Sequence, residues 1–216
     1  ETNTTPGLCR LDPNTGIGDP TPAFTYCLNL AEVEVDTKTG KTTVLKFTCV
    51  DFVGRIGNID AVNGQAYSGI MHGIGFALKE DYADVKKHAN MFGAGTSYIK
   101  DVPDDINLIH IDGAISDGPF GSSGASEAFQ ASGHCAVLNG IYNACGVRIH
   151  EIPALPEKVK ASLNAIAKGE KPYEPKKYFL GSDMYEELEN IKENPVQVGT
   201  QSFYVSLDDP TAERPF

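Results

Sequence analysis

An alternation of apolar and polar side chains over residues 24–52 most restricts the fold that this chain can adopt. The alternating apolar residues are Phe24, Tyr26, Leu28 and Leu30, followed in the opposite phase by Val33 and Val35. A period of two predicts a β-strand, and the change of phase predicts a β-bulge near Ala31. Residues 36–40 have the length and the terminal glycine of a hairpin loop. On the returning strand, one side is expected to carry Leu45, Phe47 and Cys49, and the other Val44 and Val50. The pattern predicts a hairpin in a sheet with one well-buried face.

Three later segments carry apolar residues at helical spacing: residues 61–80, the stretch after Glu127, and residues 157–168. The first of these is loaded with glycine, at Gly64, Gly69, Gly73 and Gly75. Because each glycine inside a helix costs roughly 1 kcal/mol relative to alanine, this load indicates close backbone packing or the approach of a ligand. Short strands are expected at residues 106–113 and 147–152.

Length, charge and cysteine content argue against several classes of protein for this chain. The 216 residues allow one or two domains with a real core, and no apolar run is long enough to span a bilayer. The net charge of −11 argues against a nucleic-acid partner. The five cysteines are scattered and include no Cys-x-x-Cys pair, which argues against a zinc site or a cysteine-bound iron–sulfur cluster within this chain. Reduced, mostly buried thiols fit a cytoplasmic or anaerobic setting.

A loop rich in Gly, Pro and Ser occupies residues 117–126 and ends at a single carboxylate, Glu127. Ser126 is expected to be the N-cap of the helix that follows, with Glu127 in its first turn. Free backbone N–H groups at such a point favour an anion, and a carboxylate kept ionised in a dry pocket is a candidate general base. The alternative is an ordinary turn with a capping serine and an exposed first-turn glutamate.

The histidines give no metal-binding pattern. We expect His88 to be solvated and His110 to lie on the outer face of its strand. His134 and His150 have no partner at a spacing typical of metal ligands, and both are interpreted as structural.

Three motifs together resemble the molybdenum-cofactor large subunit of the xanthine dehydrogenase and aldehyde oxidoreductase family. The first is Gly-Ser-Ser-Gly-Ala-Ser-Glu at residues 121–127, similar to the family's glycine-rich segment that ends in a glutamate beside the metal. The second is the glycine-loaded stretch at 64–81, and the third is the segment at 146–159, which resembles the family's closing segment. They occur in the family's order with similar spacing, and together they cover roughly residues 22 to 165.

The resemblance implies an α+β fold, in which a mixed sheet with packed helices forms a cofactor-enclosing domain. Glu127 would then be the catalytic base in the hydroxylation of an aldehyde or an electron-poor heteroaromatic carbon, with oxygen from water. The backbone around Ser123, Gly124, Ala125 and Ser126 would hold the pterin. His72 stands where the family often has a glutamine near the pterin. It takes over that hydrogen-bonding role or is a satisfied packing histidine, while Gln65 is expected to pack or to support the site.

The implied cofactor is molybdopterin, expected as its cytosine dinucleotide, with molybdenum or alternatively tungsten. The chain would supply no metal ligand of its own. Electrons would leave through 2Fe–2S clusters, and in some members through FAD, on other domains or chains. The implied partners are therefore the upstream part of the large subunit, an iron–sulfur subunit and a flavin subunit, with a small-molecule substrate and no nucleic acid.

The sequence also departs from the family. Ser126 replaces the usual glycine before the glutamate, and Ala128-Phe129 replaces the proline that commonly follows in xanthine dehydrogenases, so the aldehyde oxidoreductase branch is the closer relative in this loop. The family's other cofactor segments lie upstream of this region, so the chain is expected to be a subunit or a fragment of an active enzyme. A non-catalytic structural subunit of the same fold is one alternative. An unrelated phosphate-binding domain is another, although the loop has no Lys or Arg.

The expected organisation has three parts. Residues 1–21, rich in Thr, Pro and Gly, form an extended lead-in. Residues 22–168 form the molybdenum-cofactor-binding domain, and residues 169–216 form an extension that wraps over this domain or over a partner subunit.

Overall fold

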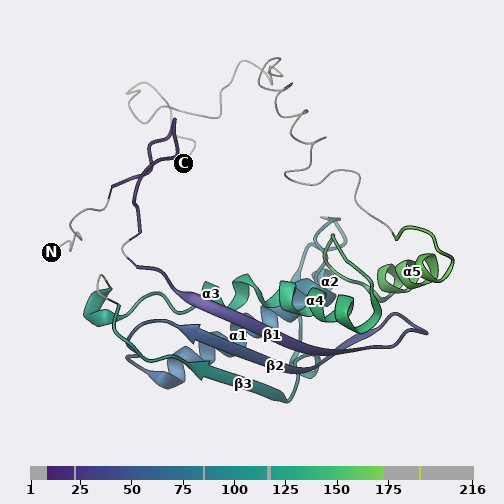
Figure 1. Ribbon diagram of the computed structural model, residues 1–216, viewed down its shortest axis with the longest axis horizontal. Helices are drawn as coiled ribbons and strands as arrows, with labels where there is room; N and C mark the ends of the chain where they lie inside the picture. Colours follow the sequence, from purple (N-terminus) through teal and green to yellow (C-terminus); the bar gives the residue numbers. More distant parts are fainter. Residues whose placement is uncertain (1–8, 22, 85, 116–117, 173–189, 191–216) are drawn as a thin grey trace. The chain divides into compact units, whose positions relative to one another are not determined.

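A three-stranded sheet with helices packed on it organises the described part of the chain (Figure 1). The computed structural model describes residues 9–21, 23–84, 86–115, 118–172 and 190. The strands are β1 (Tyr26–Val35), β2 (Thr42–Phe52) and β3 (Asp105–His110). The α-helices are α1 (Ile59–Leu78), α2 (Met91–Ala94), α3 (Glu127–Ala131), α4 (Gly133–Cys145) and α5 (Pro156–Ala167), and short 3-10 turns lie at Ile99–Asp101 and Pro119–Gly121.

The sheet is mixed. β1 and β2 are antiparallel, as the expected hairpin requires, and β3 pairs with β2 in parallel after the crossover through α1. At the hairpin, Asp36 accepts hydrogen bonds from the backbone N–H of Lys38 at 2.9 Å and from the Thr39 hydroxyl at 2.8 Å, which closes the loop. The mixed sheet and its packed helices confirm the α+β prediction.

The β-bulge lies near the expected position, but its extra residue is on the other strand. Glu32 pairs with Lys46 and Val33 pairs with Val44, so Leu45 of β2 has no partner. Leu45 is exposed, whereas Phe47 and Cys49 are fully buried, and the prediction that the three share one buried side is wrong for Leu45. The bulge reverses the side to which Val44 points, because two residues of β2 oppose one of β1.

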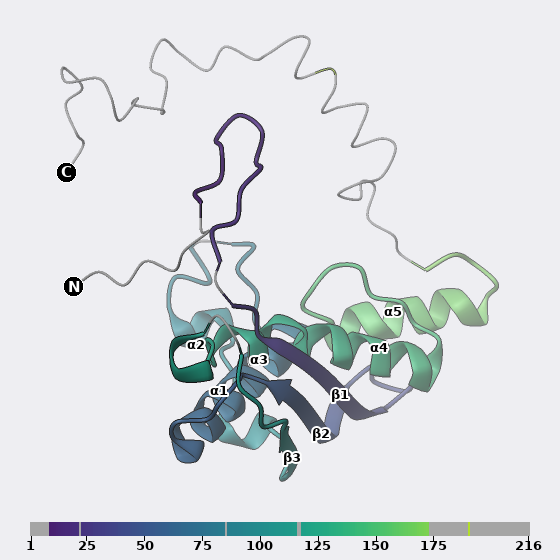
Figure 2. The same cartoon turned by 60° about the vertical axis from the view of Figure 1, so that its left-hand side comes forward.

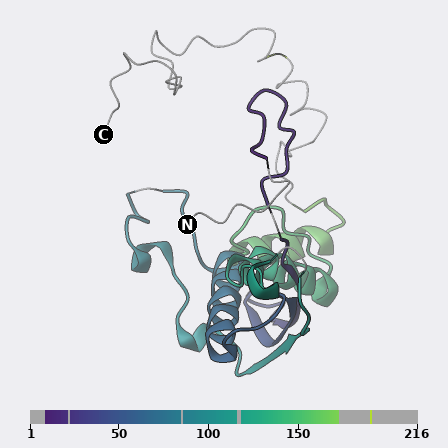
Figure 3. The same cartoon turned by 90° about the vertical axis from the view of Figure 1, so that its left-hand side faces the viewer.

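The two faces of the sheet have different environments. Residues of the inner face, including Ala31, Val33, Phe47 and Cys49, join the main hydrophobic cluster with side chains of α1, α3 and α4. Figure 3 shows α1 alongside the strands. The large side chains of Tyr26, Leu28 and Leu30 point to the outer face and are exposed.

The glycines of α1 allow close contact with α3 and α4. A Cβ atom at Gly69 would lie 2.6 Å from Cβ of Phe129, and one at Gly73 would lie 3.0 Å from Cα of Gly133. Gly64 faces open space. The glycine load therefore reflects helix packing at Gly69 and Gly73, one of the two interpretations that the sequence allowed.

The chain after Glu127 differs from expectation in two ways. The expected single helix is divided into α3 and α4 at Ser132. The strand expected at residues 147–152 is absent from this described segment. Gly146 ends α4 with a φ of 75°, and Val147 is then buried in a second hydrophobic cluster with Ile141 and Val159. The segment thus buries its apolar side chain against α4 and α5 without pairing in a sheet. Figure 2 shows α5 beside α4.

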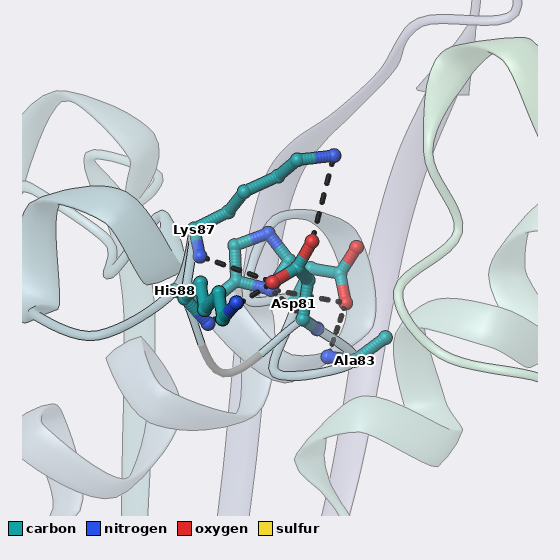
Figure 4. Close-up of polar contacts among 6 residues, drawn as sticks. Asp81, Ala83, Lys87 and His88 are labelled. Atoms are coloured by element: carbon teal, nitrogen blue, oxygen red, sulfur yellow. Dashed lines mark hydrogen bonds and ion pairs between the residues drawn. The ribbon is translucent and has the colours of Figure 1, made fainter.

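His88 is not solvated as expected, since its side chain is only 17% exposed. Its Nδ1 accepts a hydrogen bond from the backbone N–H of Asp84 at 3.2 Å and lies 3.8 Å from Oδ1 of Asp81 (Figure 4). Asp81 also accepts from the backbone N–H of Ala83 at 2.9 Å. These contacts fold the segment after α1 into a turn. The many charged residues of this segment predict exposure, and they do not predict that His88 is enclosed by its neighbours.

The ends of the chain add little to this picture. In the lead-in, the backbone N–H of Cys9 donates to the carbonyl of Asp19, and residues 9–21 are exposed. The contacts of the chain group into residues 1–174 and 175–216. Most of the extension expected from residue 169 lies outside the described residues and stays a prediction. No helix in the described part of the chain is long and apolar enough to cross a membrane.

Candidate active site

The loop that precedes Glu127 is fixed to the end of β2. The backbone N–H of Arg55 donates to the carbonyl of Gly121 at 2.8 Å, and the N–H of Ser123 donates to the carbonyl of Val53 at 2.9 Å. The hydroxyl of Ser122 also donates to the carbonyl of Arg55 at 2.5 Å. These bonds attach a loop of glycines and serines to the sheet, so its conformation does not depend on its own weak propensities.

The first residues before β1 hold the same loop from another side. The hydroxyl of Thr25 lies 2.8 Å from the hydroxyl of Ser123 and donates to the carbonyl of Gly124 at 2.5 Å. The methyl group of Ala125 packs against the main hydrophobic cluster. Ser123, Gly124 and Ala125 are therefore positioned by contacts from segments about a hundred residues apart in the sequence.

The loop bends sharply at Phe120 and Gly121, which have φ angles of 54° and 84°. Glycine adopts this left-handed region without strain, but a bulky side chain does so at a cost of order 1 kcal/mol or more. The Phe120 side chain is 98% exposed, so no described residue compensates that cost by packing.

The backbone from Gly124 to Ser126 could bind an anion or another hydrogen-bond acceptor through its N–H groups. Its N–H groups donate no hydrogen bond to any described residue, and a Cβ atom at Gly124 would meet nothing within 4 Å. Free N–H groups beside open space suit phosphate or pterin oxygens and ring nitrogens. The residues present therefore fit a pterin-type cofactor in this respect.

Glu127 is the first residue of α3, and its side chain is exposed. It forms no ion pair with a described residue. Ser126 occupies the N-cap position as expected, but its side chain makes no capping hydrogen bond. The serine hydroxyl and the carboxylate are consequently both free for contacts outside the described residues.

His72 and Gln65 lie on one stripe of α1 together with Gly69, since residues three or four apart share a helix face. Gly69 contacts α3 at Phe129, so both side chains flank the contact between α1 and the helix that carries Glu127. His72 is half-buried, with its ring centroid 6.3 Å from that of Phe76, and Gln65 is exposed. Among the described residues, no hydrogen bond joins either side chain to Glu127.

A polar network that joins β2, β3 and α1 was not predicted from the sequence. Nδ1 of His110 lies 2.7 Å from Oδ2 of Asp51, and its Nε2 lies 2.7 Å from Oδ1 of Asn63. The His110 side chain is only 12% exposed, so the expectation that it points outward is wrong. Burial raises the pKa of the Asp51 carboxyl, while His110 lowers it. The signal was present in the sequence, because Asp51 and His110 each continue the inward phase of an alternating strand.

Two thiols also meet on the inner face. Sγ of Cys27 lies 3.4 Å from Sγ of Cys49, and both cysteines are free. The hydrogen bond with Cys49 lowers the pKa of the Cys27 thiol and raises that of Cys49, which burial raises further. Among the described residues, no group of three or more His, Cys, Asp or Glu side chains is arranged to hold a metal ion.

Comparison with known proteins identifies the family. A family model described as a molybdopterin cofactor-binding domain matches residues 2–103. The chain is 44% identical over 162 residues to the aldehyde oxidoreductase of Megalodesulfovibrio gigas, and 30% identical over 151 residues to a probable hypoxanthine oxidase of Escherichia coli. These matches cover 75% and 68% of the chain.

A solved structure agrees in fold. The crystal structure of the aldehyde oxidoreductase from Desulfovibrio desulfuricans matches 67% of the chain with a TM-score of 0.65 and 49% identity. The chain spans only 16 to 18% of the length of these relatives. It belongs to the xanthine dehydrogenase and aldehyde oxidoreductase family, as part of the molybdopterin-binding region of that family.

Proposed function

We propose that this chain is part of a molybdopterin-dependent hydroxylase that oxidises an aldehyde or an N-heteroaromatic carbon with oxygen taken from water. One observation carries the proposal: a glycine-rich loop, fixed to the sheet by residues 53–55, presents free N–H groups and ends at the exposed carboxylate of Glu127. The names of the relatives, aldehyde oxidoreductases and a probable hypoxanthine oxidase, support both substrate classes.

In this proposal the loop from Ser123 to Ser126 holds the pterin through the free N–H groups of Gly124, Ala125 and Ser126, because the N–H of Ser123 is bonded to the carbonyl of Val53. Thr25 keeps this backbone in place through Ser123 and Gly124, so the N–H groups are oriented before the cofactor binds. His72 and Gln65, which flank the contact of α1 with α3, supply or support hydrogen bonds to it. The bound cofactor, expected as the cytosine dinucleotide with molybdenum or tungsten, supplies the two-electron acceptor.

Glu127 acts as the general base. Its carboxylate accepts the proton of the attacking water-derived oxygen, which raises the nucleophilicity of that oxygen toward the substrate carbon. The side chain is exposed on this chain, so the rest of the enzyme must exclude water around it. The hydroxyl of Ser126, which makes no capping hydrogen bond, supplies a further donor beside this carboxylate.

The proposed assembly includes the remaining part of the large subunit, an iron–sulfur partner with 2Fe–2S clusters and, in some arrangements, a flavin subunit. We propose a cytoplasmic location for it. If the chain were instead a structural subunit that lacks catalysis, the same assembly would form without using Glu127.

The test is Glu127→Gln in the complete enzyme. Loss of a positioned general base should lower kcat by about 10²- to 10⁴-fold, while the molybdenum content per complex is unchanged. The matched control is Glu157→Gln, which removes another exposed first-turn glutamate, in α5, and should leave turnover unchanged. Undiminished turnover in Glu127→Gln would exclude the base role and favour the structural subunit.

A further inference from the structure

Two free thiols lie in contact on the inner face of the sheet, and we call them the thiol pair. Sγ of Cys27 in β1 lies 3.4 Å from Sγ of Cys49 in β2. The register places the two residues diagonally, because Cys27 pairs with Asp51 and Cys49 pairs with Asn29. A disulfide bond needs about 2.05 Å between its sulfur atoms, so side-chain rotations that bring the two sulfurs roughly 1.4 Å closer would join them.

The two thiols of the pair differ in their access to solvent. Cys27 is half-buried, whereas Cys49 is fully buried in the main hydrophobic cluster. The hydrogen bond with Cys49 lowers the pKa of the Cys27 thiol, and the thiolate is the form of cysteine that reacts with oxidants. An oxidant that arrives from solvent therefore meets Cys27 first, and Cys49 lies behind it as the thiol that completes a disulfide.

Hydrogen bonds link the thiol pair to the end of α3. The S–H of Cys27 donates to Oδ1 of Asn29 at 3.8 Å, so the S–H of Cys49 is the donor in the contact between the two sulfurs. Nδ2 of Asn29 donates in turn to the carbonyl of Phe129 at 3.2 Å and to the hydroxyl of Ser132 at 3.0 Å. Because a disulfide sulfur carries no proton, oxidation of the pair would remove the S–H group that orients Asn29 toward α3.

We propose that Cys27 and Cys49 form a reversible redox switch, which a hydroperoxide closes to a disulfide and which, when closed, loosens the contact of Asn29 with α3. Any effect of the switch on catalysis rests on the proposed role of Glu127, the first residue of α3, whereas the disulfide itself does not. Transient disulfides of this kind are the ones that occur in reducing compartments, where structural disulfides are rare.

The oxidation balances in two steps. The Cys27 thiolate attacks one oxygen of the hydroperoxide, so that an S–O bond forms as the O–O bond breaks, and the other oxygen leaves as water or an alcohol with the proton that the thiol lost. Sγ of Cys49 then attacks the sulfenic sulfur of Cys27. The S–S bond forms, the S–O bond breaks, and the hydroxyl group leaves as water with the proton of Cys49. The two sulfurs lose two electrons and the peroxide gains them, and a dithiol reductant returns them by thiol–disulfide exchange.

The test is treatment of the complete enzyme with hydrogen peroxide, followed by alkylation of the remaining thiols under denaturing conditions, trypsin digestion and mass spectrometry. Trypsin separates Cys27 and Cys49 into the peptides 11–38 and 47–55, each with a single cysteine. We expect peroxide to join these two peptides and dithiothreitol to separate them again. Two separate, alkylated peptides after peroxide treatment would overturn the proposal. Irreversible oxidation of Cys27 alone, or preferential linkage of either residue to another cysteine, would overturn it as well.

Two serine variants assign the roles within the pair. Cys27→Ser should leave Cys49 reduced and alkylated after peroxide treatment, because the thiol that meets the oxidant first is gone. Oxidation of Cys49 to the parent's extent in this variant would contradict the proposed order of attack. The matched control is Cys145→Ser, which removes a half-buried thiol outside the pair and should form the linked peptides as the parent does. Circular dichroism checks that both variants fold.

Hydrogen exchange followed by mass spectrometry tests the link to α3. In the oxidised enzyme the amides of Glu127–Ala131 should exchange roughly two- to tenfold faster, the factor expected for the loss of one hydrogen bond, while those of α5 keep their rates. Peroxide-treated Cys27→Ser should show no such change. Unchanged exchange in α3 after the disulfide has formed would refute the coupling. None of these readouts depends on turnover or metal content, so a failure here is distinct from a failure of the Glu127 test.

Discussion

Asp51 is a carboxylate placed where water cannot reach it. Its side chain is 1% exposed and its Oδ1 has no partner among the described residues, while Oδ2 is held by His110. Because burial raises its pKa above the usual 3.8, Asp51 favours folding most at acid pH, and this contribution is lost as the pH rises through the folded-state pKa. His110 lowers that pKa and so limits the loss.

His110→Leu should therefore destabilise the fold by about 3 kcal/mol near neutral pH, since it leaves a buried carboxylate without its partner. The destabilisation should shrink as the pH falls through the raised pKa of Asp51, because a neutral carboxyl group loses less than a buried carboxylate when its hydrogen-bond partner is removed. Urea unfolding at several pH values between about 4 and 7 measures this trend. In an Asp51→Asn background the trend should vanish, and a loss that is equal at all pH values would contradict the account.

For single residues, the alternation along a strand predicts the direction of a side chain better than the polarity of that residue does. Phe47, Cys49 and Asp51 share one phase of β2, and His110 continues the phase of Ile106 and Leu108 in β3. Following the phase predicts both polar side chains as inward-facing. The polarity of His110 alone predicts that it points to the outer face of the sheet, and that prediction is wrong. Glu127 could be singled out because its loop is unusual in composition, but the hydrogen bonds of that loop to residues 53–55 join irregular segments far apart in the chain, which no local pattern predicts.

The helices show where local patterns stop being sufficient. The helical spacing predicts α1 and α5 within two residues of their ends. It does not predict the break at Ser132, since the same apolar spacing continues through α3 and α4. The break lies next to Gly133, whose Cα approaches Gly73 of α1, so tertiary packing determines the local geometry.

Two glycines of α1 allow this packing to be tested within one helix. Gly64→Ala should stabilise the protein by roughly 0.5–1 kcal/mol, because the new methyl group meets nothing within 4 Å and alanine is the better helix former. Gly69→Ala should destabilise it by roughly 1–3 kcal/mol, because its Cβ would lie 2.6 Å from Cβ of Phe129 and 2.9 Å from the backbone nitrogen of Gln130. Thermal unfolding of both variants measures the effects. If Gly69→Ala stabilised the protein as Gly64→Ala is expected to, the close contact of α1 with α3 would be refuted.

At the scale of the whole molecule, the described residues bury two hydrophobic clusters of unequal size. The main cluster joins the sheet to α1, α3 and α4, and the smaller one joins Ile141 of α4 to Val147, Ala154 and Val159. Leu78, at the end of α1, packs against both. The smaller cluster holds α5, so α5 depends on few buried side chains.

Val159→Ala should consequently open α5 without unfolding the sheet. The substitution removes fully buried methyl groups and should cost about 2 kcal/mol, which is a large part of the stability of a helix held by so few contacts. Hydrogen exchange followed by mass spectrometry should show faster exchange of the amides in Pro156–Ala167, while those of α1 and β2 keep their rates. Ile166→Ala, which trims an exposed side chain of the same helix, should change neither. Equal acceleration in α1 and α5 would mean that the two clusters unfold as one unit and that Leu78 couples them tightly.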